Sequence, residues 1–419
     1  MKGFRELTSV REAMEKIRKT VTHRIGETEE VSLDSALGRV CGEPVKASRD
    51  SPEYDRSAVD GYAVVAEDTF GASVTNPAEL KVLGRLEAGS AGSESFEVRR
   101  GEAVEIMTGA PIPRGANAVV PAESAKRVGD RVEVYQQVHP YQNVSRRGED
   151  YRVGDIVLEK GVILKPWHLG ALASLGLDKI KVLRKPKIAV LSTGAELVDP
   201  GEEISEGQVY NSTKPMLKSM LRELGAEPLD LGTAGDQVEE ISEKISEGIR
   251  EADAVIVTGG TSVGTRDLVP EAVSRIGEIV VHGLRIRPGK PAGFGVVNGK
   301  PVFMLSGFPV ASLVGFRVLV VPALEHMMEC RFDENPKVRG VLTRRITSPP
   351  GIRTFARVRI FTDEQGKIFV EPLRVTGSGI LSTLTRGNGL LIIPEEVEGY
   401  DEGEIVEVEL LSPIQSQKG

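Results

Sequence analysis

Two adjacent glycines, Gly259 and Gly260, separate a run of apolar residues from a segment rich in hydroxyl side chains. The apolar residues 254–258 predict a strand buried on both faces, and a helix is expected after the hydroxyl segment. Paired glycines let the backbone turn tightly, so that its amides and the positive end of the next helix can face an anion. Thr261 and Ser262 add hydroxyl donors. The pattern indicates a phosphate-binding turn, and an ordinary strand-to-helix connection is the alternative.

Asp267 ends this segment, and two further carboxylates, Glu196 and Asp236, follow other apolar runs of the same region. A carboxylate does not itself bind phosphate, so one beside such a turn favours a metal ligand or a partner for a cation or a hydroxyl. Together the three could surround a hard divalent cation such as Mg²⁺. Each could instead cap a helix, above all Asp236, which directly precedes a helical pattern.

A short basic run lies downstream and contains Arg285, Arg287 and Lys290. Cations so close together repel one another unless an anion lies between them. The run therefore predicts an oxyanion or phosphate site, with a solvated basic edge as the alternative.

The region that must position these groups, residues 182–328, alternates strand-like and helix-like patterns. Such alternation predicts a three-layer α/β domain, in which the loops at the carboxyl ends of the strands converge on one edge. The binding candidates in these loops are Thr193, Gly194, Gly259, Gly260, Thr261, Ser262 and Ser306.

Three further regions are predicted to complete a multidomain α/β plus β protein. Residues 51–141 contain short alternating runs between turn residues and predict a β-rich inserted domain. Residues 1–50 and 142–181 flank the insert and predict one discontinuous N-terminal domain. Residues 336–412 return to short strands and predict a C-terminal β domain resembling a barrel.

Three polar residues mark loops of the insert and its end. Asp60 precedes a glycine and an aromatic residue, Thr108 precedes a proline-framed bend, and Asp150 closes the insert. Such segments are typical of loops that reach into a cleft rather than of strands within a sheet.

The composition excludes several classes of protein. The 419 residues are 40% hydrophobic and 27% charged, which is ordinary for a globular chain. No apolar run approaches the roughly 18 residues of a membrane span, and the first residues lack the apolar core of a signal peptide, so we expect a cytoplasmic protein without a membrane partner. The net charge of −8 argues against nucleic acid as the main partner. The 2 cysteines and 5 histidines lack the spacing of a zinc site.

Six segments of the chain, taken in order, closely resemble the molybdopterin molybdenumtransferase family, of the MoeA and gephyrin E-domain type. They are SAVDGYAV, MTGAPIPRGANAVVPAE, RRGEDYRVGD, STGAEL, TGGTSVGTRD and RPGKP. The resemblance covers essentially the whole chain. It implies a MogA-like α/β domain and the Mg²⁺-dependent insertion of molybdate, or tungstate, into adenylated molybdopterin with release of AMP. It also implies an elongated homodimer, with the site between the α/β domain of one subunit and the insert of the other.

The resemblance also assigns roles to residues of this chain. Positions that match catalytic acidic or hydroxyl positions of the family are Asp60, Thr108, Asp150, Glu196, Asp236 and Asp267, of which the last three are also the expected metal ligands. Positions expected to bind the oxyanion or the cofactor are Arg287, Lys290 and, in the C-terminal region, Ser378. Electrostatic positioning, rather than a covalent nucleophile, would then carry catalysis.

One loop departs from the family pattern. The segment that usually reads LPGNPVS is LSGFPVAS here, so Ser306 replaces a proline, Phe308 an asparagine and Ala311 a serine. Arg287 stands where the family usually has a lysine, and it prefers planar, bidentate partners. These changes leave the choice between molybdate and tungstate open.

Two other functions remain alternatives. One is a molybdopterin adenylyltransferase of the MogA type, which the additional domains disfavour; the other is a non-catalytic paralogue that binds pterin or scaffolds a partner, which the retained carboxylates disfavour. A separate adenylyltransferase is also a candidate protein partner, because the resemblance implies an adenylated substrate.

Overall fold

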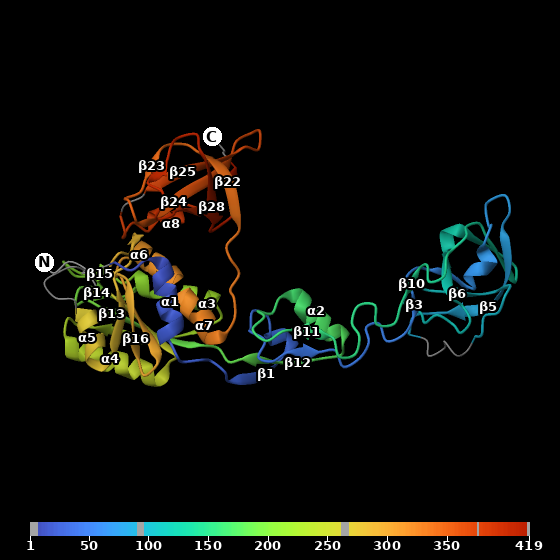
Figure 1. Cartoon of the computed structure of the whole chain (residues 1–419), viewed down its shortest axis with the longest axis horizontal. Helices are drawn as coiled ribbons and strands as arrows, with labels where there is room; N and C mark the ends of the chain where they lie inside the picture. Colours follow the sequence, from blue (N-terminus) through green and yellow to red (C-terminus); the bar gives the residue numbers. More distant parts are fainter. Residues whose placement is uncertain (1–6, 90–95, 261–267, 375–376, 417–419) are drawn as a thin grey trace.

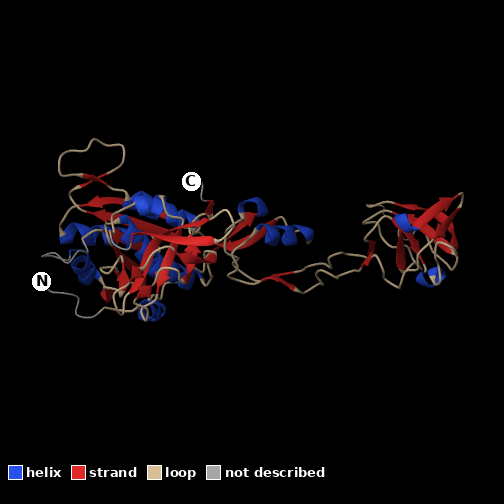
Figure 2. Ribbon diagram, turned by 90° about the horizontal axis from the view of Figure 1, so that it is seen from above, coloured by secondary structure: helices blue, strands red, loops and turns tan. Residues whose placement is uncertain are grey.

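The computed structural model describes residues 7–89, 96–260, 268–374 and 377–416. The molecule is elongated, with the α/β domain and a C-terminal β domain at one end and the β-rich insert at the other (Figure 1). The N-terminal domain lies between them, and two extended segments join it to the insert (Figure 2). The predicted multidomain α/β plus β architecture is confirmed.

A six-stranded sheet forms the centre of the α/β domain, with the strand order β16-β13-β17-β21-β20-β18. The first four strands in this order run parallel, whereas β20 is antiparallel to both of its neighbours. The strands are β13 (Lys187–Thr193), β16 (Glu227–Ala234), β17 (Ala254–Thr258), β18 (Glu278–His282), β20 (Gly293–Val297) and β21 (Lys300–Leu305). All 5 residues of β17 are buried, as a strand covered on both faces requires.

Helices cover both faces of this sheet and give the predicted three layers. Helices α4 and α5 contribute to the apolar core on one face, and α1, α3, α6 and α7 contribute to the core on the other. They are α1 (Val10–Thr20), α3 (Thr213–Glu223), α4 (Val238–Glu251), α5 (Leu268–Ile276), α6 (Pro309–Gly315) and α7 (Val321–Met328), with a π-helical turn (Phe316–Val320) between the last two.

Among the described residues, Pro309–Met328 form a 20-residue helical run that is long and apolar enough to cross a membrane by length and composition. Its most apolar stretch has a mean hydropathy of 1.5, and 67% of that stretch is buried inside the protein. The run packs in the α/β core, and this burial accounts for its apolar composition.

The first helix belongs to the α/β core by its packing. Ser9 caps α1 in a reciprocal capping box with Glu12. Val10, Ala13 and Ile17 on the buried face join the cluster that contains α7. We predicted that residues 1–50 belong to the N-terminal domain, but the apolar stripe of α1 is buried by the α/β domain. The other predicted limits of the domains stay predictions.

The N-terminal domain is built from both sides of the insert. Strand β1 (Thr28–Ser32) pairs with β12 (Lys179–Leu183), and β2 (Val45–Lys46) pairs with β11 (Ile156–Leu158). The short helix α2 (Pro166–Ser174) adds Leu172 to the same small core.

The insert contains a six-stranded sheet with the order β7-β4-β6-β5-β9-β8. Its strands are β4 (Gly61–Val64), β5 (Ala78–Leu86), β6 (Glu102–Ile106), β7 (Ala118–Pro121), β8 (Ala125–Val128) and β9 (Arg131–Val134). At the base of the insert, β3 (Arg56–Ser57) pairs with β10 (Val144–Ser145), and this pairing joins the two segments that enter and leave the insert.

The C-terminal domain closes into a barrel. Its strands have the order β24-β25-β22-β28-β26, and the last strand, β26, pairs with the first, β24. These strands are β22 (Lys337–Leu342), β24 (Arg353–Thr362), β25 (Ile368–Arg374), β26 (Gly389–Ile393) and β28 (Ile405–Leu410). Smaller elements are β23 (Ile346–Thr347), α8 (Ser382–Thr385), β27 (Gly399–Tyr400) and β29 (Gln415–Ser416).

A buried ion pair ties the N-terminal domain to the α/β sheet. The Asp253 carboxylate, 5% exposed, lies 2.8 Å from Nη1 of Arg184. It also lies 2.8 Å from Nε2 of His23 and accepts a 2.8 Å hydrogen bond from the Lys187 amide. Burial raises the pKa of Asp253, but the hydrogen bonds from Arg184, His23 and Lys187 outweigh burial and lower it to about 2. The carboxylate therefore stabilises the fold in its charged form.

We predict that Asp253→Asn lowers the free energy of unfolding by about 3 kcal/mol at neutral pH, because it removes the buried carboxylate of the ion pair and leaves half-buried Arg184 with only the exposed Glu27 as a counter-charge. The folded-state pKa lies below the ordinary value of 3.8, so the stabilisation is complete above that value and is lost as the pH falls through about 2. Urea unfolding should therefore show a difference between variant and wild type that shrinks from about pH 4 to about pH 2. Glu251→Gln, a change at the exposed end of α4, is the matched control. A difference independent of pH over this range would contradict the prediction.

Candidate functional site

A cavity of about 740 Å³ opens at the carboxyl ends of the parallel strands in the α/β domain. It brings together the described members of the predicted binding set. These residues are Thr193, Gly194, Glu196, Asp236, Gly259, Gly260, Arg287, Lys290, Ser306 and Ser378. Another cavity, of about 790 Å³, lies beside α1 and α7 and contains none of them. The first cavity is therefore the candidate site.

The glycine turn after β17 has the geometry that its sequence predicts. Gly259 and Gly260 have φ angles of 89° and 57°, in the left-handed region that favours glycine. A Cβ on Gly259 would lie 2.3 Å from the Thr193 carbonyl oxygen, and one on Gly260 would lie 2.9 Å from Val269. A larger residue at Gly259 would therefore meet backbone, and one at Gly260 would meet the side chain of Val269. Thr261, Ser262 and Asp267 lie outside the described residues, and their roles stay predictions.

Buried hydroxyl and amide groups support the floor of the cavity. The Thr193 hydroxyl donates to the Thr258 carbonyl at 3.2 Å, and the Asn211 amide donates to the Ser192 hydroxyl at 2.8 Å. Thr193 is 3% exposed and Asn211 is 3% exposed. The Thr193 side chain thus joins β13 to β17. Its contact with a ligand stays a prediction.

Glu196 and Asp236 are the two described carboxylates of the predicted metal set, and both line the cavity. Gln237, not Asp236, occupies the N-cap of α4, and no side chain caps that helix, so the capping alternative for Asp236 is wrong. Within the described residues, neither carboxylate has a side-chain hydrogen bond or an ion pair.

These carboxylate oxygens are suitable ligands for Mg²⁺. The described residues contain no group of three His, Cys, Asp or Glu side chains that could hold a metal, and Asp267, the third predicted ligand, is not among them. The metal set therefore stays a prediction.

Two of the three cations in the basic run face the cavity. Arg287 is half-buried and Lys290 exposed along its wall. Arg285 does not line the cavity; its Nε donates to the Leu7 carbonyl at 3.0 Å. The expectation that all three surround one anion is therefore wrong for Arg285, because its guanidinium binds the carbonyl of Leu7 in the N-terminal segment instead.

The shape of the basic loop depends on its neighbours. Gly289 has a φ of 106°, and a Cβ there would lie 3.2 Å from the carbonyl oxygen of Ala311 in α6. The short strand β19 (Ile286–Arg287) pairs in parallel with β24 of the barrel, so that Arg287 lies opposite Thr354. The loop is held between the α/β domain and the C-terminal barrel.

The loop after β21 supplies a serine and joins the barrel to the site. The Ser306 hydroxyl accepts a hydrogen bond from the Phe308 amide at 3.2 Å, whereas fully buried Ser312 donates to the Ser306 carbonyl. The carbonyl of Ser378, from the barrel, accepts from the Val310 amide at 3.0 Å. Ala311 removes a hydroxyl that the family usually has in this loop, and two nearby serines could replace it. Of these, Ser306 lines the cavity and Ser312 does not.

Part of the cavity wall comes from residues that were not among the predicted binding residues. Two of these residues are Tyr210, the last residue of the small strand β15 (Val209–Tyr210), which pairs with β14 (Leu197–Val198), and Asn211, which lies between β15 and α3. Phe308 also lines the cavity. Both loops start at the carboxyl edge of a parallel strand. The rule that located the other loops could therefore have found them.

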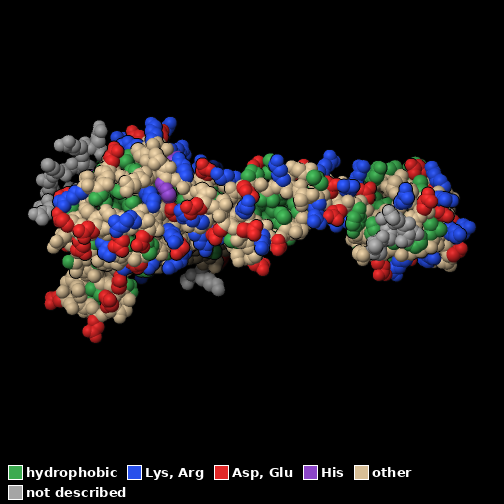
Figure 3. Space-filling model, turned by 90° about the horizontal axis from the view of Figure 1, so that it is seen from below, with side chains coloured by type: hydrophobic (Ala, Val, Ile, Leu, Met, Phe, Trp, Pro, Cys, Tyr) green, Lys and Arg blue, Asp and Glu red, His purple; other side chains and the backbone are tan. Residues whose placement is uncertain are grey.

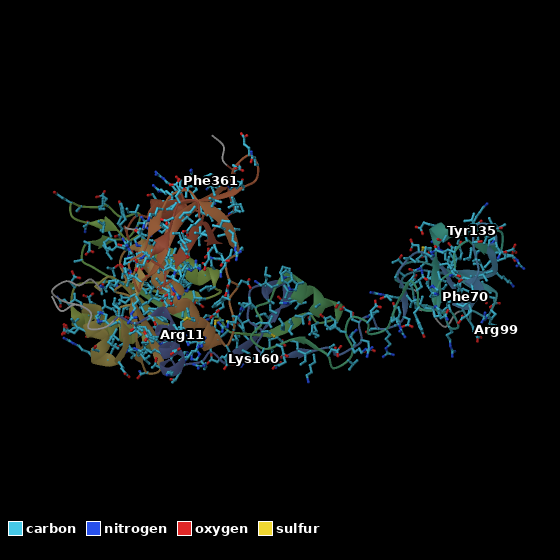
Figure 4. All side chains as sticks on the ribbon, turned by 45° about the horizontal axis from the view of Figure 1, so that its top comes forward. Arg11, Phe70, Arg99, Tyr135, Lys160 and Phe361 are labelled. Carbon is cyan, nitrogen blue, oxygen red and sulfur yellow. The ribbon has the colours of Figure 1, made fainter. Side chains whose placement is uncertain are left out.

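Asp60, Thr108 and Asp150 do not join this cavity in the same chain. Asp60 accepts hydrogen bonds of 2.7 Å from both the hydroxyl and the amide of Thr108, and these bonds lower the pKa of Asp60. Both residues belong to the insert region. Figure 4 labels Tyr135 in the insert and Phe361 in the barrel, at opposite ends of the molecule. The composite site expected from the sequence would thus need the insert of another copy of the chain.

Three family models match successive parts of the chain. Residues 8–176 match the MoeA N-terminal region (domain I and II), residues 189–326 a probable molybdopterin binding domain, and residues 339–411 the MoeA C-terminal region (domain IV). The order of these matches is the order of the regions described above.

Full-length relatives agree with these matches. A molybdopterin biosynthesis protein of Methanocaldococcus jannaschii is 44% identical over 393 residues, 92% of this chain and 92% of the relative. Molybdopterin molybdenumtransferase 2 of Mycobacterium tuberculosis is 39% identical over 373 residues, 88% of this chain and 91% of the relative.

A solved structure extends the agreement to three dimensions. The crystal structure of a molybdopterin biosynthesis MoeA protein from Pyrococcus horikoshii superposes with a TM-score of 0.84 and 37% identity, covering 97% of this chain and 100% of that chain. Domain order, sequence identity over most of the chain and the shared fold lead to one conclusion: the chain belongs to the MoeA family of molybdopterin molybdenumtransferases.

Proposed function

We propose that this enzyme of molybdenum cofactor biosynthesis inserts molybdate into adenylated molybdopterin, in a Mg²⁺-dependent reaction that releases AMP. The observation that carries the proposal is the cavity, where a glycine turn, two carboxylates and two cations meet in the domain that matches a molybdopterin-binding family. Each group suits one part of this chemistry: the turn suits a phosphate, the carboxylates suit a divalent cation, and the cations suit an oxyanion.

In this mechanism the chain positions charged reactants. The turn at Gly259 binds the phosphate of the substrate through backbone amides, and Arg287 and Lys290 hold the oxyanion beside it. Glu196 and Asp236, with Asp267, would hold Mg²⁺, which supplies positive charge against the phosphate oxygens. Fixed charges around the cavity stabilise the departing AMP, so the residues need no covalent bond to the substrate.

We further propose that the active unit is a homodimer in which the insert of one subunit completes the cavity of the other. The insert, to which Asp60 and Thr108 belong, lies far from the α/β domain of its own chain (Figure 1). No described residue of the insert lines the cavity, which supports this arrangement. The N-terminal domain also exposes apolar side chains, some of them visible on the face in Figure 3. The large ones are Leu37, Val153, Ile156 and Trp167, with exposures of 57%, 63%, 52% and 69%. Exposed apolar side chains of this kind favour a surface that another subunit covers.

The setting proposed for this reaction is the cytoplasm, and the proposed protein partner is an adenylyltransferase that supplies the adenylated substrate. Tungstate is the alternative oxyanion, because Arg287 and the LSGFPVAS loop alter the wall beside it.

The function is tested by nucleotide release. With adenylated molybdopterin and Mg²⁺, AMP should appear when molybdate or tungstate is added and stay near background without either. Chromatography of the nucleotides gives the readout, and elemental analysis after competition between the two oxyanions gives the preference. Pyrophosphate release from ATP would instead support an adenylyltransferase, and substrate binding without AMP release would support a scaffold.

Lys290→Ala should raise the molybdate concentration for half-maximal rate about tenfold, because it removes one charged hydrogen-bond donor from the oxyanion. Affinity for the pterin substrate should change less. Arg285→Ala is the matched control, since it removes a cation from the same loop but outside the cavity. Steady-state kinetics with molybdate varied at saturating substrate measure both variants. Equal losses in molybdate use and pterin affinity would place a phosphate, rather than the oxyanion, beside Lys290.

Subunit mixing tests the composite site. Asp60→Ala and Lys290→Ala should each be impaired alone, but a heterodimer of the two contains one site with an intact insert and an intact cavity. Random exchange of subunits should therefore restore about a quarter of wild-type activity. Mixing two preparations of Asp60→Ala is the control. Absence of recovery, despite heterodimers detected by native mass spectrometry, would rule out a site shared between subunits.

A further inference from the structure

Phe308 is an exposed aromatic residue in the wall of the candidate site. Its side chain is 60% exposed, although the neighbouring residues of the helix that it precedes are buried. The side chain lines the cavity together with the glycine turn and the basic loop. An aromatic ring among fixed charges adds a surface that none of those charges provides.

Hydrogen bonds fix the backbone that carries this ring. The Phe308 amide donates to the Ser306 hydroxyl at 3.2 Å, and the Phe308 carbonyl accepts from the Ser312 amide at 2.9 Å. Phe308 is the N-cap of α6, and Pro309 restricts the next position. Hydrogen bonds at both the amide and the carbonyl fix the backbone of Phe308 and therefore the direction in which its Cβ leaves the chain.

The barrel supports one edge of the ring. A Cβ built on Gly379 would lie 3.0 Å from Cδ1 and 3.4 Å from Cε1 of Phe308. Gly379 lines the same cavity and follows Ser378, whose carbonyl binds the Val310 amide. The ring thus rests against a glycine of the C-terminal domain, and most of its surface stays open to the cavity.

The charged groups of the cavity account for only part of the proposed substrate. Arg287, Lys290, Glu196 and Asp236 suit phosphate, oxyanion and metal. A pterin or an adenine is instead a planar, bicyclic ring, and such rings stack on aromatic side chains. Tyr210, 47% exposed, is a second aromatic residue in the wall, but its hydroxyl donates to the Glu202 carbonyl at 3.1 Å.

We propose that Phe308 is the stacking residue for the planar heteroaromatic ring of the substrate. The proposal rests on the proposed function, because that function supplies a ligand with both a phosphate and such a ring. In place of the amide of the family's usual asparagine, this chain offers an apolar face, which recognises the shape of the ring rather than its hydrogen-bonding groups.

A purely structural role for Phe308 would give a different result. If the ring served only to seat the barrel on the α/β domain through Gly379, its removal would weaken every ligand of the cavity alike and lower thermal stability. Stacking predicts a loss that depends on whether the ligand carries a ring. Ligands with and without a ring therefore separate the two roles.

Isothermal titration calorimetry of the full-length protein with Mg²⁺ tests this difference. The probes are AMP, a phosphorylated pterin, and ribose 5-phosphate, which has the phosphate but no ring. Phe308→Ala should weaken the binding of at least one ring-bearing probe about tenfold and change ribose 5-phosphate less than about twofold. The probe that loses affinity identifies the ring as adenine or pterin. Phe308→Leu should behave like Phe308→Ala, since it keeps apolar area but has no aromatic face.

Ile405→Ala is the matched control, because this side chain of the barrel is 71% exposed and lies outside the cavity. It should leave all three affinities unchanged. Thermal unfolding of each variant verifies that the fold is retained. Equal weakening of all probes by Phe308→Ala would overturn stacking in favour of the structural role.

A spectroscopic experiment measures the contact directly. Trp167 is the chain's 1 tryptophan and lies in α2 of the N-terminal domain. In a Trp167→Phe background, Phe308→Trp becomes the sole tryptophan, and a stacked ring should quench its fluorescence on binding. If both AMP and the pterin bind without a change in fluorescence, the proposal is overturned. Failure of the wild-type protein to bind either ring-bearing probe would instead refute the proposed function, together with the inference that rests on it.

Discussion

The site depends on the close approach of the glycine turn after β17 to the neighbouring strand β13. The turn comes so close to the Thr193 carbonyl that a Cβ on Gly259 would lie 2.3 Å from it. This approach is possible only because β13 and β17 are adjacent and parallel, so both end at the same edge of the sheet. The cations, carboxylates and serine of the cavity are all arranged around that edge.

The C-terminal barrel is the second requirement for the site. Strand β19 carries Arg287 and pairs with β24, and Ser378 of the barrel binds the first turn of α6. The basic loop and the loop after β21 are therefore both fixed by contacts with another domain. Rigid support of this kind keeps charged groups at the separations that electrostatic catalysis requires.

The elongated shape follows from the way in which the insert is attached. Paired strands at the base of the insert and in the N-terminal domain hold it away from the α/β domain, and no described residue of the insert lines the cavity. Each domain also has its own apolar core. Function therefore depends on how the surfaces of these domains are brought together.

The sequence by itself determined the alternation of strands and helices, the fold class, the glycine turn and the loops that carry Glu196, Asp236 and Lys290, because these features rest on local periodicity and on the conformational freedom of glycine. Only the tertiary structure decided that Arg285 binds the N-terminal segment and that α1 packs in the α/β core. It also decided that Phe308 is exposed in the cavity beside Gly379. These outcomes depend on contacts between residues far apart in the chain, and local patterns do not specify which distant surfaces will meet.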